Sequence, residues 1–217
     1  MISAVLLSWR RPENLRQIIA SLWSWDRVSE VIVWNNDPEM HIQAPDRRVT
    51  VINSSRNFYC FARYAMVPLL ANDTVLFHDD DLCLRPEQLE QIYVEYAKDA
   101  GRVYGPFGKR IVDGLLYEQT PAGPRARQNH YGEVDIILGR CSLFNRSLYQ
   151  RALKHIPLPI KYEDDVAFSL AATKASGRRH IAIKVGPFVD ICGSDEHSSW
   201  KTRGFAQARE IIVQRLK

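Results

Sequence analysis

The chain has 217 residues, of which 46% are hydrophobic and 25% are charged, as expected for a soluble protein with a substantial core. Its net charge of +4 comes without a run of Lys or Arg, which argues against a nucleic-acid partner and suits an anionic substrate such as a nucleotide diphosphate. The four cysteines form no CxxC pair, so we expect reduced thiols rather than a zinc site or a disulfide framework.

The N-terminal residues lack the layout of a signal peptide, and no apolar run is long enough to span a membrane. We therefore expect a cytoplasmic protein without a transmembrane segment. Any contact with a membrane would be peripheral, made from the surface of the protein or through a partner.

The first eighty residues contain short apolar runs and one clearly amphipathic stretch. Leu15, Ile18, Ile19 and Leu22 have the i, i+3, i+4, i+7 spacing of a helix. The expected strands and helices are Ile2–Leu7 (strand), Asn14–Trp23 (helix), Val31–Trp34 and Val49–Ile52 (strands), Phe61–Leu70 (helix) and Thr74–Phe77 (strand). This order predicts an α/β fold with an open, mostly parallel central sheet and helices on both faces.

A polar cluster follows each of these four strands. The clusters are Ser8–Arg11, Asn35–Asp37, Ser54–Asn57 and Asp79–Asp81. In open α/β sheets, ligands bind at the carboxyl ends of the strands. The shared placement of the four clusters therefore predicts one ligand site at that edge.

Three adjacent carboxylates, Asp79, Asp80 and Asp81, follow the fourth strand. Because the three acids repel one another, a bare fold gains nothing from this placement, whereas a divalent cation would remove the repulsion. Mg²⁺ and Mn²⁺ typically use one or two carboxylates together with substrate phosphates. Alternate side chains of an extended strand share a face, so Asp79 and Asp81 could point to one side and Asp80 to the other. Nucleotide-sugar transferases hold a metal diphosphate with such a D-x-D pattern; the alternative is a solvated acidic turn.

The second half of the chain mixes helices and strands with a stretch rich in Gly, Pro, Arg and Gln at 108–132, where we expect loops and a hairpin around Asp113-Gly114. The other expected elements are helix Pro86–Tyr96, strands Val103–Phe107 and Val134–Leu138, helices Arg146–His155 and Asp164–Ala175, strand Ile181–Val185 and helix Phe205–Leu216. Gly177 is the expected C-cap of the helix that begins at Asp164.

A second acidic cluster, Tyr162-Glu163-Asp164-Asp165, begins a helix. Acids at this position cap a helix and complement its dipole, but one acid is enough for that purpose. The excess favours a second role, in which a carboxylate faces a sugar carbon or an attacking hydroxyl. Further along, His197 could bind a metal, donate to a phosphate or simply lie in a loop. Basic residues then follow at Lys201, Arg203 and Arg209, and guanidinium groups can hold phosphate in a bidentate way.

Several segments together resemble the exostosin-type glycosyltransferases, the α-N-acetylhexosaminyltransferases that act on heparan-type chains. In order, they are VIVWNN at 31–36, Arg63, VLFHDDDL at 75–82, ILGRCSLFNRSLY at 137–149, YEDDVAFSL at 162–170, and Trp200, Arg203 and Arg209. The order and spacing hold over most of the chain. The stretch at 108–132 matches poorly, and His78 stands where the family usually has an apolar residue.

The resemblance implies a GT-A fold, Mn²⁺ (or Mg²⁺), a UDP-sugar donor and transfer with retention. By this resemblance, Asp81 would bind the metal, Asp79 would face the nucleoside, Asp165 would lie near the reacting carbon and Arg209 would meet the diphosphate, while Asn36 and Arg63 would line the nucleotide pocket. Together with the polar clusters read from the sequence itself, this gives the expected site. The metal ligands are Asp81, Asp79 and His197, the catalytic acids are Asp165 and Asp164, and the nucleotide-sugar-binding residues are Ser8, Trp9, Arg10, Asn35, Asn36, Arg63, Asp79, Asp80 and Arg209.

We therefore expect a single glycosyltransferase domain over 1–217, in which 1–100 bind the nucleotide and 101–217 bind the acceptor and carry catalysis. It would transfer an N-acetylhexosamine from a UDP-sugar to a glycan or another hydroxyl acceptor. Three alternatives stay open: an inverting transferase with Asp164 or Asp165 as general base, a sugar-phosphate nucleotidyltransferase, and a non-catalytic sugar-nucleotide-binding module. A nucleotidyltransferase usually has a Gly-rich loop after its first strand, and SWRRPEN contains no Gly.

Overall fold

The computed structural model describes residues 1–112, 115–116, 129–157, 160, 162–191 and 205–216. Its centre is an eight-stranded sheet with the order β10-β13-β6-β12-β4-β1-β2-β3. The strands are β1 (Ile2–Ser8), β2 (Val28–Asn35), β3 (Val49–Asn53), β4 (Thr74–Asp79), β6 (Tyr104–Gly105), β10 (Gly132–Val134), β12 (Cys141–Asn145) and β13 (His180–Ala182). Four neighbouring pairs are parallel, whereas β12 is antiparallel to β4 and β6, and β10 is antiparallel to β13. The expected open, mostly parallel sheet is confirmed.

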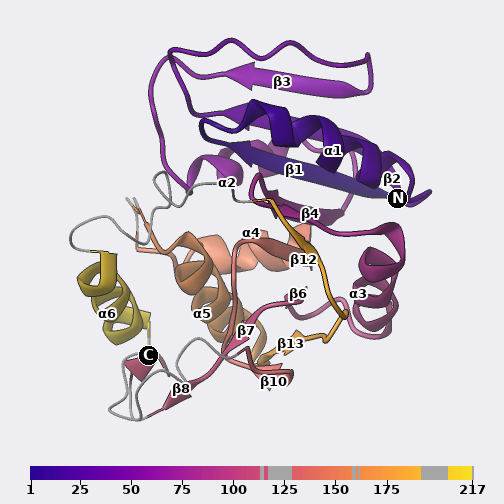
Figure 1. The fold of residues 1–217 in the computed structure, drawn as a ribbon. Coiled ribbons are helices and arrows are strands. Elements are labelled where there is room, and N and C mark those ends of the chain that lie inside the picture. The colour runs from indigo at the N-terminus through magenta and orange to yellow at the C-terminus, as the bar shows by residue number, and fades with distance from the viewer. Residues whose placement is uncertain (113–114, 117–128, 158–159, 161, 192–204, 217) are drawn as a thin grey trace.

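Helices cover both faces of this sheet, as expected (Figure 1). One face packs against α1 (Pro12–Trp23) and α3 (Pro86–Lys98). The other packs against α2 (Ala62–Met66) with its 3₁₀ turn η1 (Val67–Leu69), α4 (Arg146–Leu153), α5 (Asp164–Ser176) and α6 (Phe205–Leu216). The alternation of side chains along a strand divides the two cores: Leu76 of β4 lies in the first, and Val75 and Phe77 lie in the second.

Smaller strand pairs lie beside the main sheet. They are β5 (Leu82–Cys83) with β14 (Val189–Asp190), β7 (Gly108–Lys109) with β11 (Ile136–Ile137), and β8 (Ile111–Val112) with β9 (Leu115–Leu116). The β8–β9 pair confirms the expected hairpin, although its Asp113-Gly114 turn lies outside the described residues. No helix in the described part of the chain is long and apolar enough to cross a bilayer.

Several expected elements differ from the structure in extent, and β12, a strand of the main sheet, was not predicted. The expected strand at 134–138 is divided between β10 and β11, because Asp135 between them accepts a hydrogen bond from Ile111 N at 2.7 Å and pairs with Arg179 at 3.0 Å. The expected helix at 61–70 stops at Met66 and continues as a 3₁₀ turn through Pro68, which lacks the N–H that an α-helix needs. Strand β12 was not predicted because its short apolar run has no distinguishing period.

Candidate active site

A buried arginine joins the carboxyl end of β4 to the start of α5. Arg63, on α2, is 3% exposed. Its Nη2 lies 2.7 Å from Asp79 Oδ1, and its Nε lies 3.2 Å from Asp164 Oδ2. The same guanidinium donates hydrogen bonds to the carbonyl oxygens of Gly139 at 2.8 Å and Cys60 at 3.2 Å. Two acidic clusters that are far apart in the sequence therefore share one counter-ion.

Each carboxylate of the acidic triplet is paired with its own arginine. The pairs are Asp79–Arg63 at 2.7 Å, Asp80–Arg11 at 3.1 Å and Asp81–Arg140 at 3.1 Å. Three guanidinium groups from separate parts of the fold therefore already offset part of the repulsion within the triplet, a role that was expected of a divalent cation. The alternation of an extended strand also stops at Asp79, where β4 ends and a turn begins.

Asp80 is buried and holds the start of α1 against the end of β4. Its Oδ2 accepts a hydrogen bond from Trp9 N at 2.7 Å, and its carbonyl oxygen accepts one from Asn14 Nδ2 at 2.8 Å. Burial raises the pKa of the Asp80 carboxyl to about 7, against the opposing effect of the Trp9 N–H and of Arg11. These contacts place Asp80 inside the fold, and its contact with a nucleotide stays a prediction.

Asp79 and Asp81 are the accessible members of the triplet, with side chains 27% and 22% exposed. Burial raises the pKa of Asp79 to about 6, with Arg63 opposing the rise and the charge of Asp81 adding to it. Within the described part of the chain, Asp79 Oδ1 accepts no well-aligned hydrogen bond despite its ion pair. A nearby cation would stabilise such a carboxylate.

The donor set fits a Mg²⁺ or Mn²⁺ ion bound together with a diphosphate. Two carboxylates are the number such ions typically take from a protein when substrate phosphates supply further oxygen ligands. Among the described residues, no group of three or more His, Cys, Asp or Glu side chains could hold a metal by itself. His197, the third expected ligand, lies outside the described residues, as do Trp200, Lys201 and Arg203.

The acids at the start of α5 divide into a buried and an accessible one, as their adjacent places on a helix require. Asp164 is 4% exposed, faces Arg63, and has its pKa raised to about 7 by burial. Asp165 is half-buried, and its two oxygens accept hydrogen bonds from Gly139 N at 2.9 Å and Val166 N at 2.8 Å. These backbone donors fix the direction of the Asp165 carboxylate.

Arg209, expected at a diphosphate, holds Glu163 in this structure. Its Nε and Nη2 donate to the two oxygens of Glu163 at 2.8 and 2.9 Å, in a bidentate pair. Glu163 is 3% exposed, and burial raises its pKa to about 8, with the charge of Asp165 adding to the rise. The pair fixes α6 beside the N-terminus of α5, so Arg209 lies next to the residue that precedes Asp164 and Asp165.

The polar residues after β1 and β2 are mostly engaged inside the fold. Asn35 donates to Met40 O at 2.6 Å and to Asn53 Oδ1 at 3.0 Å, and Asn36 accepts from Phe58 N at 3.0 Å. Ser8 is fully buried at the end of β1, where it pairs in register with Asn35. The two asparagines therefore shape the loops around the site.

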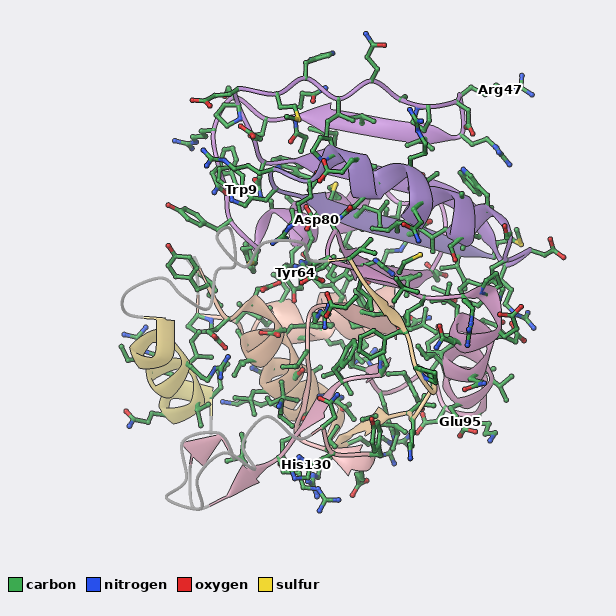
Figure 2. All side chains as sticks on the ribbon, viewed as in Figure 1. Trp9, Arg47, Tyr64, Asp80, Glu95 and His130 are labelled. Atoms are coloured by element: carbon green, nitrogen blue, oxygen red, sulfur yellow. The ribbon has the colours of Figure 1, made fainter. Side chains whose placement is uncertain are left out.

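Trp9 and Arg10 are the accessible residues of the expected nucleotide-binding set at the end of β1. The Arg10 guanidinium lies 4.8 Å from the centre of the Trp9 ring, and its side chain is 43% exposed. Figure 2 shows Trp9 near Asp80, which accepts its backbone N–H, whereas Arg47, Glu95 and His130 lie at the periphery. A nucleotide at this edge would meet Trp9 and Arg10 first.

Backbone strain gathers around the same edge. The non-glycine residues with positive φ in the described chain are Arg10 at 60°, Tyr59 at 58° and Glu163 at 62°. Each such residue costs on the order of 1–3 kcal/mol and persists where the surrounding structure imposes it. Arg10 follows β1, Tyr59 accepts a hydrogen bond from Asn36, and Glu163 precedes the catalytic candidates.

Sequence reasoning gave no individual role to four residues of this cluster: Arg11, Gly139, Arg140 and Glu163. A useful signal was available for the arginines, because three adjacent acids next to a buried strand need positive partners. Gly139 acts through its backbone N–H and C=O, which no side-chain motif reveals. A separate hollow of about 600 Å³ is lined by α3 residues with Trp25 and Ile183, and none of the aspartates of the candidate active site lies in its lining.

Several solved structures share this architecture. A mannosyltransferase from Pyrobaculum calidifontis, solved with GDP-Man and Mn²⁺, matches 99% of this chain and 68% of its own, with a TM-score of 0.63 and 14% identity. GalNAc-T7, solved with UDP, GalNAc and Mn²⁺, matches 85% of this chain and 42% of its own, with a TM-score of 0.63 and 11% identity. TarS from S. aureus, solved with UDP-GlcNAc, matches 86% of this chain and 57% of its own, with a TM-score of 0.58 and 14% identity. The fold is that of the GT-A glycosyltransferases.

The sequence itself then places the protein within that class. The Glycosyl transferase family 64 domain matches residues 2–160, and the chain belongs to this family. The protein is a glycosyltransferase. No curated protein sequence matches the chain significantly.

Proposed function

We propose that the protein is a metal-dependent, exostosin-type glycosyltransferase that moves an N-acetylhexosamine from a UDP-sugar to a glycan hydroxyl with retention. The observation that carries this proposal is the meeting of two acidic motifs. Asp79 and Asp81 at the end of β4, and Asp165 at the start of α5, are connected through Arg63 and the Gly139-Arg140 turn. Residues 1–100 would bind the nucleotide, and 101–217 would bind the acceptor, within one domain.

Each accessible residue has a role in this proposal. Asp81 and Asp79 would hold Mn²⁺ or Mg²⁺, which when bound neutralises the charge that grows on the leaving diphosphate. Asp165, oriented by Gly139 N and Val166 N, would face the reacting sugar carbon. Arg209 would lie at the diphosphate, where a guanidinium can stabilise developing charge. Trp9 and Arg10 would contact the nucleoside.

The route to retention can be either same-face attack guided by the leaving phosphate or a covalent step on Asp165. In the covalent step, an Asp165 oxygen would form a bond to the anomeric carbon as the bond to the diphosphate oxygen breaks. Mass spectrometry of protein incubated with donor alone distinguishes the two. A glycosyl adduct on Asp165 supports the covalent route.

An inverting reaction is the second candidate, and the burial of Asp164 limits the choice of general base to one acid. Asp164 faces the Arg63 guanidinium at 3.2 Å and is 4% exposed, so Asp165 is the acid that could serve as general base. The anomeric configuration of the product, measured by NMR, decides between inversion and retention. Release of pyrophosphate would instead support a nucleotidyltransferase, and binding without turnover would support a binding module.

The test is a donor screen that needs no acceptor. UDP-GlcNAc, UDP-GalNAc, UDP-glucose and GDP-mannose are incubated with Mn²⁺ or with EDTA, and release of the nucleoside diphosphate is measured. GDP-mannose is included because a neighbouring fold binds GDP-Man. We expect slow, Mn²⁺-dependent hydrolysis of a UDP-N-acetylhexosamine. Selective hydrolysis of GDP-mannose would overturn the assignment of the donor.

A calorimetric titration of UDP tests the metal role directly. We expect Mn²⁺ to strengthen UDP binding and Asp81→Ala to abolish this gain. The matched control is Asp46→Asn, an exposed acid paired with Arg48 on the loop before β3. Equal affinity for UDP with Mn²⁺ and with EDTA would rule out the metal role.

A further inference from the structure

One turn contacts all three aspartates proposed for the site, two of them at the carboxylate and Asp79 through its backbone N–H. Gly139 and Arg140 connect β11 to β12. Gly139 N donates to Asp165 Oδ2 at 2.9 Å, and Arg140 O accepts from Asp79 N at 3.0 Å. The Arg140 side chain then reaches Asp81, with Nε 3.1 Å from Oδ1 and Nη2 3.2 Å from the carbonyl oxygen.

The Arg140 guanidinium is held in place from several sides. It lies 5.2 Å from the centre of the Phe107 ring and 5.7 Å from that of Phe188, within the range of cation–π attraction. Its Nη2 also lies 3.3 Å from Asp190 Oδ2 on β14. The side chain is nevertheless 26% exposed, so one part of it borders solvent beside Asp81.

The Arg140 guanidinium and a metal cation would compete for the carboxylate of Asp81. Arg140 donates to Asp81 Oδ1. A metal cation bound to the same oxygen would lie within a few ångströms of the positive guanidinium, which would repel it. The backbone of Arg140 is fixed to the end of β4 through Asp79 N, but its long side chain has rotamers that lead away from Asp81. A diphosphate next to Asp81 would supply new acceptors for the guanidinium.

We propose that Arg140 is a positioning residue that exchanges partners when donor and cation bind. It holds Asp81 in the absence of a cation, opposes binding of a cation alone, and turns to the diphosphate oxygens when cation and nucleotide arrive together. The residue thereby makes the acid site specific for a metal-bound diphosphate over the free metal. The inference rests on the proposed metal-dependent function.

The main test variant is Arg140→Gln, which keeps part of the stem and an N–H donor but removes the charge. Calorimetry measures two affinities: Mn²⁺ alone, and UDP at saturating Mn²⁺. We expect Arg140→Gln to bind Mn²⁺ alone about tenfold more tightly, because the competing charge is gone, and to bind UDP with Mn²⁺ about tenfold more weakly, because a charge-assisted hydrogen bond is lost.

The control variant is Asp190→Asn, which removes the other carboxylate partner of Arg140 and leaves Asp81 untouched. If Arg140 only anchors β14, Asp190→Asn will reproduce both changes, and the inference is wrong. It is also wrong if Arg140→Gln leaves both affinities unchanged, or if it lowers the affinity for Mn²⁺ measured without UDP. If a thermal melt shows that Arg140→Gln does not fold, Arg140→Lys replaces it, because lysine keeps the charge without the planar fork. We then expect an affinity for Mn²⁺ near the parent value and a lower affinity for UDP.

Failure of the proposed metal-dependent function gives a different result in these titrations. If the parent protein binds UDP equally with Mn²⁺ and with EDTA, the metal-dependent function fails regardless of Arg140. If the parent shows the Mn²⁺ gain but the variant matches it in both titrations, only the exchange of partners fails.

Discussion

Replacing Arg63 with methionine removes the guanidinium that lies between the half-buried Asp79 and the buried Asp164. Arg63→Met keeps a long, flexible stem but leaves Asp79 and Asp164 without their shared counter-ion, and two carbonyl oxygens lose a donor. Breaking a buried ion pair by removing one partner typically costs about 3–5 kcal/mol. We therefore expect the free energy of unfolding at pH 8 to fall by roughly that amount.

The loss should depend on pH in a defined direction. The pKa values of Asp79 and Asp164 are raised to about 6 and about 7 with Arg63 present, from an ordinary 3.8. A raised pKa means that the native state binds more protons than the unfolded state above pH 3.8, so each of these groups stabilises the fold less as the pH rises through that window. Without Arg63 both pKa values rise further. The penalty for Arg63→Met should therefore be smaller at pH 5 than at pH 8, by at least about 1.4 kcal/mol, the equivalent of one proton over one pH unit.

Urea unfolding of parent and variant at pH 5, 6, 7 and 8 measures both effects, provided that the m-values agree. Arg102→Met is the matched control, because Arg102 pairs with Asp99 and Glu133 at 2.9 Å but is 23% exposed, and such surface pairs contribute about 1 kcal/mol or less. Adding Asp164→Asn to Arg63→Met should restore part of the loss at pH 8. A loss below about 1 kcal/mol at pH 8, or one that is equal at pH 5 and pH 8, would refute the reasoning.

Three further predictions follow from the same geometry. Asp165→Asn should fold and bind UDP with Mn²⁺ like the parent but lose roughly two or more orders of magnitude in turnover, whereas Asp164→Asn should lose less; near-parent turnover in Asp165→Asn would remove it from the reacting centre. Arg209→Ala should weaken UDP more than uridine in parallel titrations, and equal weakening would leave Arg209 with only its structural pair to Glu163. Burial lowers the pKa of His180 to about 4 from 6.5, so its neutral form stabilises the fold fully above pH 6.5 and less as the pH falls. The stability difference between parent and His180→Gln should therefore shrink by roughly 2 kcal/mol between pH 7.5 and pH 5 in urea titrations, and a constant difference would contradict the assignment.

Local sequence patterns predicted most of the helices and strands in the first half of the chain. The strand-helix order up to Asp79 could be predicted because each apolar run is bounded by turn residues, and α1 has a clear helical stripe. The second half was harder, since several of its strands have two or three residues and are defined by the partner they pair with. β12 lies between β4 and β6 in the sheet, and nothing in its own five residues indicates that place.

The sequence by itself determined which carboxylates stand at the end of a strand and at the start of a helix, because those are properties of neighbouring residues. Only the tertiary structure decided which of them are accessible. Asp79, Asp81 and Asp165 are partly exposed, while Asp80 and Asp164 are buried against arginines. The partners explain why sequence could not decide this: Arg140 is 59 positions from Asp81 and Arg11 is 69 from Asp80, so each pairing depends on how the chain folds back on itself. A carboxylate's charge is set by its residue type, but the energy of that charge is set by burial and by counter-ions that only the folded chain brings near.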